Sequence, residues 1–481
     1  MTGPSQQQWR RLSPRMLLVH PVHEVLRQIP VLIGSLVLGS ATGNPMWTLI
    51  GIGAIVAYGM ARWFTTTYRI GPDEVALRGG VLRRTELAVP RNRIRSVSTD
   101  ARLLHRLLGL TVLQVSTGRT ASGDTVFALD AVPAGDVPRL RAILLAGSLA
   151  PVAGGRVLAR WQPSWLRYSP LTWTGLLMIV AALGVLAQTG VLTAARGWTW
   201  VRAGAGVAQT LGLLGTVVLA VVAVLAASVA LSVAQSLLTY ANLELRRDAE
   251  VLHLSHGLLR VREHTFDMRR LRGGTLREPL LVRLFGGARL DAVMTGVTGA
   301  GEASLLLPPC PRTTAQDVLT DLIARPDVVT GPLTPHGPAA TRRRWTRAMA
   351  PPVAAVAGAV VWAVTTGVPV WVWPALAVLT VCSCALAVDR SRSLGHRSGG
   401  GWLVSRSGSL QRRRDCVAAA GIVGWTVRQT LPQRRAGVAT LIAATAAGVK
   451  RYEVIDVPAA DAWRIVATTS AWVGETGWAR G

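Results

Sequence analysis

The sequence has little lysine, little cysteine and few acidic residues. Lys450 is the only lysine, and 52 Lys+Arg stand against 25 Asp+Glu, so the excess positive charge is almost entirely arginine. Four cysteines are present, and none of their spacings is typical of a disulfide framework: Cys310, Cys382, Cys384 and Cys416. We therefore expect free thiols and a fold that does not depend on disulfide bonds.

The motifs of common enzyme classes are also missing. The chain has no Gly-x-x-x-x-Gly-Lys-Ser/Thr phosphate loop and no Gly-x-Ser-x-Gly nucleophile turn. Two His-x-x-His pairs occur, His20 with His23 and His253 with His256, but no cysteine or acidic cluster completes either as a metal site. On a strand, His253 and His256 would point to opposite faces. The sequence predicts a protein that is not an enzyme and has no cofactor or metal.

Charged residues are absent from the centres of six apolar blocks, which occur in three pairs. They cover about 29–41, 46–64, 171–192, 203–238, 349–366 and 368–388. A bilayer core requires about 20 apolar residues of helix, so the blocks predict six transmembrane helices. The fourth block would reach roughly 50 Å as a helix and would have to tilt or project beyond the bilayer. The missing intramembrane charges disfavour an ion-coupled transporter.

Nearly all the arginines lie in the N-terminus and in the long segments that follow the pairs. The short loops inside the first and third pairs carry no charge, and the loop in the second pair carries Arg196 and Arg202. The positive-inside rule therefore predicts a plasma-membrane protein with both termini and all three polar segments in the cytoplasm. The first 28 residues hold four arginines and no long apolar core, so we expect an uncleaved anchor rather than a signal peptide.

The pI of about 11.7 has two interpretations. The first is binding of nucleic acid or of anionic lipid, and the second is the positive-inside rule in an arginine-rich chain. Basic and aromatic residues do not alternate as in a base-stacking surface, so nucleic acid is not an expected partner.

Each apolar pair is followed by a similar polar segment. Each segment contains a glycine-headed basic turn, and a second glycine follows 29 residues later in all three. The glycines are Gly80 and Gly109, Gly257 and Gly286, and Gly408 and Gly437. Three equal spacings, each after an apolar pair, indicate an internal repeat.

The first copy shows what one repeat contains. Short β-rich stretches occur at 65–70, 75–77, 81–89, 94–98, 110–116 and 127–129, and an acid-capped amphipathic helix is predicted at 136–145. This pattern predicts a small antiparallel barrel or sandwich with a C-terminal helix covering one end. The domains would be 1–64 (N-terminal segment and pair 1), 65–149 (copy 1), 150–238 (pair 2), 239–326 (copy 2), 327–388 (linker and pair 3) and 389–481 (copy 3).

The first copy resembles the pleckstrin-homology-like domain of YdbS/YdbT-type bacterial membrane proteins. The resemblance rests on 68–70 after a membrane helix, the hairpin at 80–84, the stretch 89–97 and the segment 103–110 with its glycine; His20-Pro21 also fits. The three-unit organisation resembles the longer members of that family. The resemblance implies two orthogonal antiparallel sheets with a capping helix, and it implies no catalytic residues. Copy 3 is rich in alanine and glycine at 417–427, so we expect it to be degenerate.

One arginine cluster in copy 1 is the candidate contact with anionic lipid headgroups: Arg78, Arg83, Arg84, Arg91, Arg93 and Arg95. Each basic residue near an anionic surface contributes about 1 kcal/mol. The alternative is a solvated face that only reflects membrane topology. The favoured function is a non-catalytic membrane scaffold whose domains bind a partner protein or lipid, alone or as an oligomer. The second hypothesis is an exporter or its accessory subunit, for which only scattered polar residues such as Gln188, Gln209 and Gln235 are present in the apolar blocks.

Overall fold

The computed structural model describes most of the chain from residue 155 onward and parts of the chain before it. The described residues are 9–11, scattered positions from 46 to 61, 64–71, 74–80, 84–90, 96–101, 103–116, 127–137, 139–140, 155–172, 174–188, 199–295 and 304–474. They form two compact units, residues 1–161 with 238–270 and residues 162–237 with 271–481.

The first unit contains two antiparallel sheets. The four-stranded sheet has the order β1 (Arg10–Arg11), β2 (Thr67–Ile70), β3 (Glu74–Gly79) and β4 (Thr85–Pro90). The seven-stranded sheet has the order β7 (Phe127–Pro133), β6 (Leu110–Ser116), β5 (Ser96–Ala101), β11 (Val261–Asp267), β10 (Val251–His256), β9 (Glu244–Asp248) and β8 (Arg156–Arg160).

The core of copy 1 lies between these two sheets. Val75 and Val89 come from the four-stranded sheet, and Leu113 and Leu129 come from the seven-stranded sheet. All four are at most 6% exposed, and Leu140 from the C-terminal end of the copy joins the same cluster. Burying a side chain of this size contributes about 1.5–3 kcal/mol, so the alternating valines and leucines hold the two sheets together.

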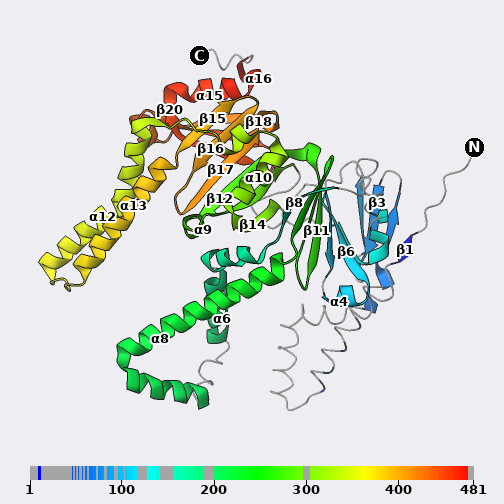
Figure 1. Cartoon of the computed structure of the whole chain (residues 1–481), viewed down its shortest axis with the longest axis horizontal. Helices are drawn as coiled ribbons and strands as arrows, with labels where there is room; N and C mark the ends of the chain where they lie inside the picture. The colour runs from blue at the N-terminus through cyan, green and yellow to red at the C-terminus, as the bar shows by residue number, and fades with distance from the viewer. Residues whose placement is uncertain are drawn as a thin grey trace, which may run out of the picture. The chain divides into compact units, whose positions relative to one another are not determined.

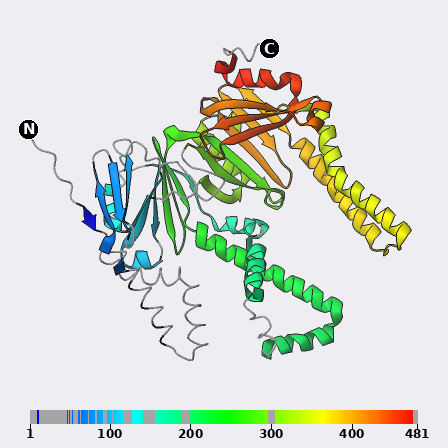
Figure 2. The same ribbon diagram turned by 180° about the vertical axis from the view of Figure 1, so that it is seen from behind.

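The second unit repeats the arrangement for copy 3. A six-stranded sheet has the order β14 (Leu305–Pro311), β13 (Gly287–Met294), β12 (Leu271–Pro279), β17 (Gln411–Ala418), β16 (Trp402–Ser407) and β15 (Gly395–Gly399). A three-stranded sheet has the order β18 (Ile422–Arg428), β19 (Val438–Thr445) and β20 (Arg451–Pro458). The helix α15 (Ala462–Thr469) lies over these strands in both ribbon views (Figure 1, Figure 2).

The expectation that copy 3 is degenerate is wrong. Its six strands are all present, and one buried cluster joins Val417, Leu441 and Tyr452 of its two sheets to Val466 of α15. Among the small residues at 417–427 that suggested erosion, Gly421 is buried, and a Cβ there would lie 2.9 Å from Arg272 Cδ. Ala443 on β19 is also fully buried within this cluster, where a large side chain would overfill the core.

The glycine landmarks are structurally equivalent in the three copies. The first glycine of each pair has positive φ, at 119°, 115° and 97° for Gly80, Gly257 and Gly408. The second has φ of 68°, 73° and 65°, and its backbone N–H donates to the carbonyl oxygen three residues earlier in each copy. The repeat that the 29-residue spacing predicted is therefore confirmed.

The sheets also join neighbouring copies. Strand β11 of copy 2 pairs with β5 of copy 1, and β17 of copy 3 pairs with β12 of copy 2. The two junctions have the same register, because Phe266 lies opposite Ser96 and its counterpart Val417 lies opposite Gly273. The sequence did not reveal this arrangement. The first three strands of copy 2 or copy 3 continue the sheet that the last three strands of the preceding copy form.

Each apolar pair is flanked by two segments that pair with each other, through strands at the first two pairs and through an isolated bridge at the third. Arg10 lies opposite Tyr68, Ala159 opposite Leu245, and Thr334 opposite His396. The segment before each pair was missed in the sequence, where 150–238 and 327–388 were assigned to linkers and membrane helices. Because the two flanking segments are hydrogen-bonded neighbours, the chain between them leaves a domain and returns to the same domain.

Three described helices are long and apolar enough to cross a membrane. They are the part of α8 (Thr199–Tyr240) from Leu214 to Tyr240, α12 (Gly337–Thr365) and α13 (Val372–Arg392). The fourth apolar block is not one continuous helix, because Gly212 breaks α8 with φ 68° and ψ 176°. The six-helix arrangement stays a prediction: the block at 29–41 lies outside the described residues, and α6 (Thr174–Gln188) covers 15 residues.

In the second pair the two helices contact each other, and in the third pair they do so as well. Gly175 N–H of α6 donates to Ser232 Oγ of α8 at 2.9 Å, and a Cβ on Gly175 would approach Ser228 O to 2.0 Å. Close helix contacts through glycine and serine are common in membranes. The α12–α13 hairpin runs away from the strands of its unit in both views (Figure 1, Figure 2).

Candidate anion-binding pocket

The arginines singled out in copy 1 are only partly described by the structure. Arg78 on β3 donates to Glu86 Oε2 at 2.9 Å, and its guanidinium lies 4.4 Å from the ring centroid of Trp9. Arg84 is exposed just before β4. Four more members of the cluster lie outside the described residues: Arg83, Arg91, Arg93 and Arg95. Arg78 is therefore held by protein groups, and the predicted lipid contact of the whole cluster stays a prediction.

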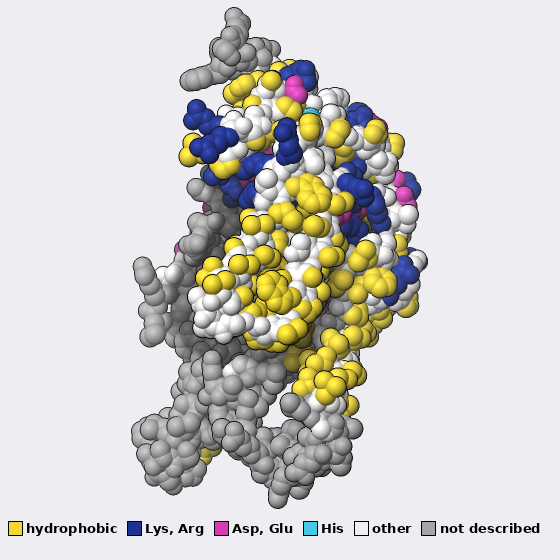
Figure 3. Space-filling view, turned by 90° about the vertical axis from the view of Figure 1, so that its left-hand side faces the viewer, with side chains coloured by type: hydrophobic (Ala, Val, Ile, Leu, Met, Phe, Trp, Pro, Cys, Tyr) yellow, Lys and Arg dark blue, Asp and Glu magenta, His cyan; other side chains and the backbone are white. Residues whose placement is uncertain are grey.

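A second arginine cluster lies at the base of the α12–α13 hairpin. The helices are antiparallel, so the first turns of α12 and the last turns of α13 are at the same end. Hydrophobic side chains cover the hairpin, and dark-blue Lys and Arg side chains gather where it meets the strands (Figure 3). Six arginines are contributed by the two helices: Arg342, Arg343, Arg344, Arg347, Arg390 and Arg392.

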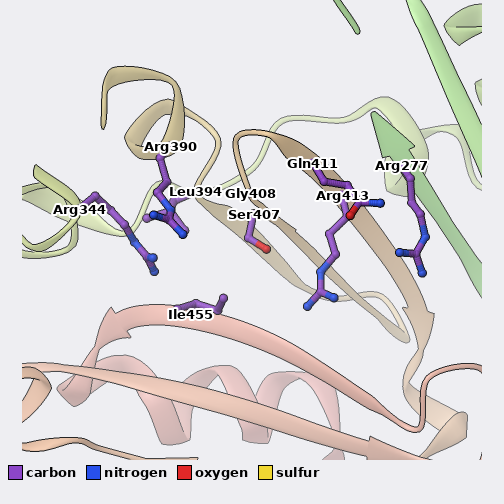
Figure 4. Close-up of a pocket in the computed structure, with 9 residues that line it drawn as sticks. All are labelled: Arg277, Arg344, Arg390, Leu394, Ser407, Gly408, Gln411, Arg413 and Ile455. Carbon is purple, nitrogen blue, oxygen red and sulfur yellow. The ribbon is translucent and has the colours of Figure 1, made fainter. Parts of the chain in front are cut away.

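A cavity of about 260 Å³ lies in this basic region. Arg344 comes from α12, Arg390 from α13, Arg277 from β12 and Arg413 from β17 (Figure 4). The other lining residues are Leu394, Ser407, Gly408, Gln411 and Ile455. In Figure 4, Arg344 and Arg390 lie on one side of Ser407 and Arg277 and Arg413 lie on the other. The cavity is thus surrounded by four guanidinium groups and a serine hydroxyl.

The nearby carboxylates neutralise only part of this charge. Asp291 is shared by Arg277 and Arg289, and Asp456 is shared by Arg343 and Arg344. Asp415 pairs with Arg413 at 3.3 Å, whereas Arg390 makes no ion pair among the residues that the structure describes. Six guanidinium groups therefore face three carboxylates. Burial also raises the pKa of Asp415, which disfavours its charged form and weakens its compensation of Arg413.

Arg344 is the most buried of the four arginines. It is 5% exposed, and its Nη2 lies 2.6 Å from Asp456 Oδ2. Its Nε has no hydrogen-bond partner among the described residues. Buried polar groups are normally hydrogen-bonded, and an unsatisfied guanidinium donor favours an acceptor-rich ligand. A phosphate oxygen in the cavity would supply such an acceptor.

The depth of the pocket matches the headgroup layer. Arg344 precedes Met349, where the fifth apolar block begins, by five residues. Five residues of helix rise about 7 Å. The headgroup region on each side of a bilayer is about 5–8 Å thick, so a pocket at this depth would lie beside lipid phosphates when α12 spans the membrane.

Two histidines lie at the same base but add no charge at neutral pH. The rings of His336 and His396 are 5.0 Å apart, and His336 Nδ1 lies 2.7 Å from Ile455 O. Burial, with a smaller contribution from His396, lowers the pKa of His336 to about 4. Burial also lowers the pKa of His396. The positive charge of the pocket therefore comes from arginine.

The pocket contains the copy 3 version of the basic hairpin recognised in copy 1. The two lining residues Gly408 and Gln411 occupy the positions of Gly80 and Arg83. The sequence singled out the corresponding hairpin of copy 1, and the lipid contact proposed there stays a prediction. Arg277, Arg344 and Arg390 could not be found in this way, because they come from three distant segments that share no motif.

The remaining candidate residues have ordinary structural roles. His253 Nδ1 lies 3.2 Å from Thr265 Oγ1, and His256 Nδ1 lies 2.7 Å from Thr239 O, so the two side chains have different partners. His20 and His23 lie outside the described residues. Burial raises the pKa of the Cys310 and Cys416 thiols to about 12, which keeps both protonated.

The chain matches the bacterial PH domain family three times, over residues 25–148, 206–322 and 349–470. These matches cover well over half of the sequence and coincide with the three repeats. No curated protein and no solved structure is significantly similar to the chain. Repeated PH domains with helices apolar enough to cross a membrane are typical of a membrane protein that binds lipid or protein. The chain belongs to the bacterial PH domain family.

Proposed function

We propose that this protein is a non-catalytic scaffold of the plasma membrane that holds anionic lipid headgroups in the arginine pocket at the base of α12 and α13. The observation that carries the proposal is the position of Arg344 and Arg390 at the end of an apolar hairpin, around a cavity with more guanidinium groups than carboxylates. Basic pockets beside transmembrane helices on the cytoplasmic side suit phosphate headgroups.

The fold supports a common location for the three domains. Because segments on both sides of each apolar pair are hydrogen-bonded to each other, a pair that enters the bilayer has to return to the side from which it left. The arginine excess supports the cytoplasm as that side. We propose as part of this function that the chain is related to YdbS/YdbT-type proteins and has three transmembrane helix pairs.

Lipid retained by the purified full chain tests the proposal. The critical variant is Arg390→Gln, because Arg390 makes none of the ion pairs among the described residues and its loss leaves no carboxylate without a partner. Arg392→Gln is the matched control, since Arg392 is exposed two residues later and does not line the cavity. Phospholipid extracted from each protein after purification in neutral detergent is quantified by mass spectrometry.

The proposal predicts that the unmodified chain and Arg392→Gln retain anionic phospholipid and that Arg390→Gln retains several-fold less. Loss of one phosphate contact of about 1 kcal/mol corresponds to roughly fivefold weaker binding. Excess inorganic phosphate separates a lipid site from a site for free phosphate. A site for free phosphate would exchange its bound phosphate and carry no phospholipid, whereas a lipid site would keep its phospholipid. Equal retention by both variants, or retention of neutral lipid alone, contradicts the proposal.

A further inference from the structure

The ends of the repeat array are two strand edges that fit each other. At both junctions inside the chain, the third strand of one copy pairs with the fourth strand of the copy before it. The third strand of copy 1 is β4, which ends its four-stranded sheet. The fourth strand of copy 3 is β18, which ends its three-stranded sheet. Neither has a strand partner on its outer side among the described residues.

The two internal junctions show a shared pattern of side chains. Phe266 and Val417, which occupy equivalent positions, lie opposite the small residues Ser96 and Gly273. Two positions along, His264 and Asp415 lie opposite hydroxyl-bearing residues, Ser98 and Thr275. In the second junction, Thr275 Oγ1 donates to Asp415 Oδ1 at 2.8 Å.

The free edges carry the small and the hydroxyl residues of this pattern, while Leu87 stands where the junctions have the polar His264 and Asp415. On β4, Val89 occupies the position of Phe266 and Val417, and on β18, Gly424 occupies the position of Ser96 and Gly273. Leu87 would then lie opposite Thr426, which again supplies a hydroxyl. Thr426 and Glu86 are exposed, so the edges are accessible in the single chain.

The proline on β4 does not block pairing. Proline lacks the backbone N–H, and on an exposed edge it normally prevents association. Pro90, however, follows Val89, and both internal ladders end at the position of Val89: Asp267 and Ala418, the counterparts of Pro90, are not paired across either junction. The part of β4 that would enter a ladder retains its N–H groups.

We propose that copies of this chain associate head to tail, with β18 of one chain pairing antiparallel with β4 of the next in the register of the internal junctions. Val89 then lies opposite Gly424, and Thr85 lies opposite Arg428. The partner is a second copy because its edge has the same spacing of small and hydroxyl residues as the two junctions that the chain forms with itself. Such a heterologous contact produces a ring or a linear array.

Disulfide trapping between full-length chains in membranes tests this register. Cys382 and Cys384, which are exposed and partly exposed, are replaced by serine. Cys310 and Cys416 are buried and are kept. One chain carries Thr85→Cys, and a differently tagged chain carries Arg428→Cys; both positions are exposed. The control pairs Thr85→Cys with Thr426→Cys, which is also exposed and lies two residues away on the same face.

The expected result is a cross-linked heterodimer for Thr85→Cys with Arg428→Cys and several-fold less for the control. Opposite Cβ atoms are about 4.5–5.5 Å apart, whereas diagonal ones are about 7–8 Å apart and exceed the reach of a disulfide. Equal yields in the two pairs, or no cross-link in either, overturn the proposal. Capture of a different protein without any self-cross-link also overturns it, since the partner would then not be a second copy.

The mass of the unmodified chain in detergent gives a second measurement that does not depend on engineered cysteines. The proposal predicts species larger than one chain. Gly424→Val should shift them toward the single chain, because the larger side chain would stand opposite Val89 of the next chain, where both internal junctions have a small residue. The single chain itself should tolerate the change, since a Cβ at Gly424 meets only the Ala444 side chain, at 3.9 Å. A monomer at all concentrations overturns the proposal.

Discussion

Asp389 of α13 and Arg412 of β17 are joined by a hydrogen-bonded ion pair, in which Arg412 Nη2 donates to Asp389 Oδ1 at 2.9 Å. The other carboxylate oxygen accepts from Arg283 Nη2 and from Ser409 Oγ, each at 2.8 Å. One carboxylate at the end of an apolar helix thus connects that helix to the basic hairpin of copy 3. The connection fixes the wall of the pocket that contains Arg390.

Asp389→Asn should loosen this connection and destabilise the second unit. The side chains of Arg283 and Arg412 are 13% and 19% exposed, so both would lose a charged partner in a partly buried place. We expect a cost of about 1–3 kcal/mol, measured as a lower midpoint of thermal unfolding in detergent.

Asp461→Asn is the matched control for that change. Asp461 pairs with Arg464, whose side chain is 73% exposed. Exposed pairs contribute about 0–1 kcal/mol, so the midpoint should hardly move. Equal shifts for the two variants would contradict the role given to Asp389.

Acid should destabilise the base of α12 through His336. Its pKa is about 4 in the folded protein, below the ordinary 6.5, because burial disfavours the charged ring. A lowered pKa stabilises the fold above pH 6.5, and that contribution is lost as the pH falls from 6.5 toward 4. The complete loss corresponds to about 3 kcal/mol.

His336→Asn is the variant that isolates this effect. Asp456 and Arg344 lie beside the two histidines at the base of the hairpin and also influence the pKa of His336. His396 has a lowered pKa of its own and remains in the variant. The difference in unfolding midpoint between the parent and His336→Asn should therefore change between pH 7 and pH 4.5. A constant difference would show that His336 does not titrate in this range.

Gly408→Ala should destabilise the basic hairpin. Gly408 has φ of 97°, and a Cβ there would lie 2.1 Å from Gln411 O, a backbone atom. Left-handed backbone alone costs a non-glycine residue about 1–2 kcal/mol. Gly358→Ala on α12 is the control, because nothing lies within 4 Å of its added Cβ. A Gly408→Ala chain as stable as the control would contradict the structure of this turn.

Cysteine labelling should place the loop between α12 and α13 outside the cell. A single cysteine at Thr366, which is exposed between the helices, should react with a membrane-impermeant thiol reagent in intact cells. Single cysteines at Ser164 and Arg451, exposed on the domain side, should react only after permeabilisation. All three require a background in which Cys382 and Cys384 are serine. The reverse pattern would contradict the positive-inside orientation.

Local patterns in the sequence predicted much of this architecture. The apolar blocks at 349–366 and 368–388 correspond to most of α12 and α13, because a run of apolar residues is a property of a single segment. The glycine spacing predicted the repeat, since each glycine has a positive φ that other residues avoid. Both signals can be read without knowing what the segment contacts.

Long-range pairing could not be predicted in the same way. Strand β12 pairs with β17 across more than 130 residues, and nothing in either strand alone specifies that partner. Thr334 forms only an isolated bridge with His396, and no alternating pattern surrounds it. The pocket combines Arg277, Arg344 and Arg390 through these pairings, so it becomes visible only after the chain is folded.

Photo-cross-linking from inside the pocket tests the central claim most directly. A benzoylphenylalanine at Ile455, which lines the cavity, is irradiated in native membranes, and the same residue at Trp463 on exposed α15 serves as the control. The account predicts that the purified full-length chain gains the mass of an anionic phospholipid at Ile455 and none at Trp463. Adducts of neutral lipid at Ile455, or equal yields at the two positions, would contradict an arginine pocket that holds anionic headgroups.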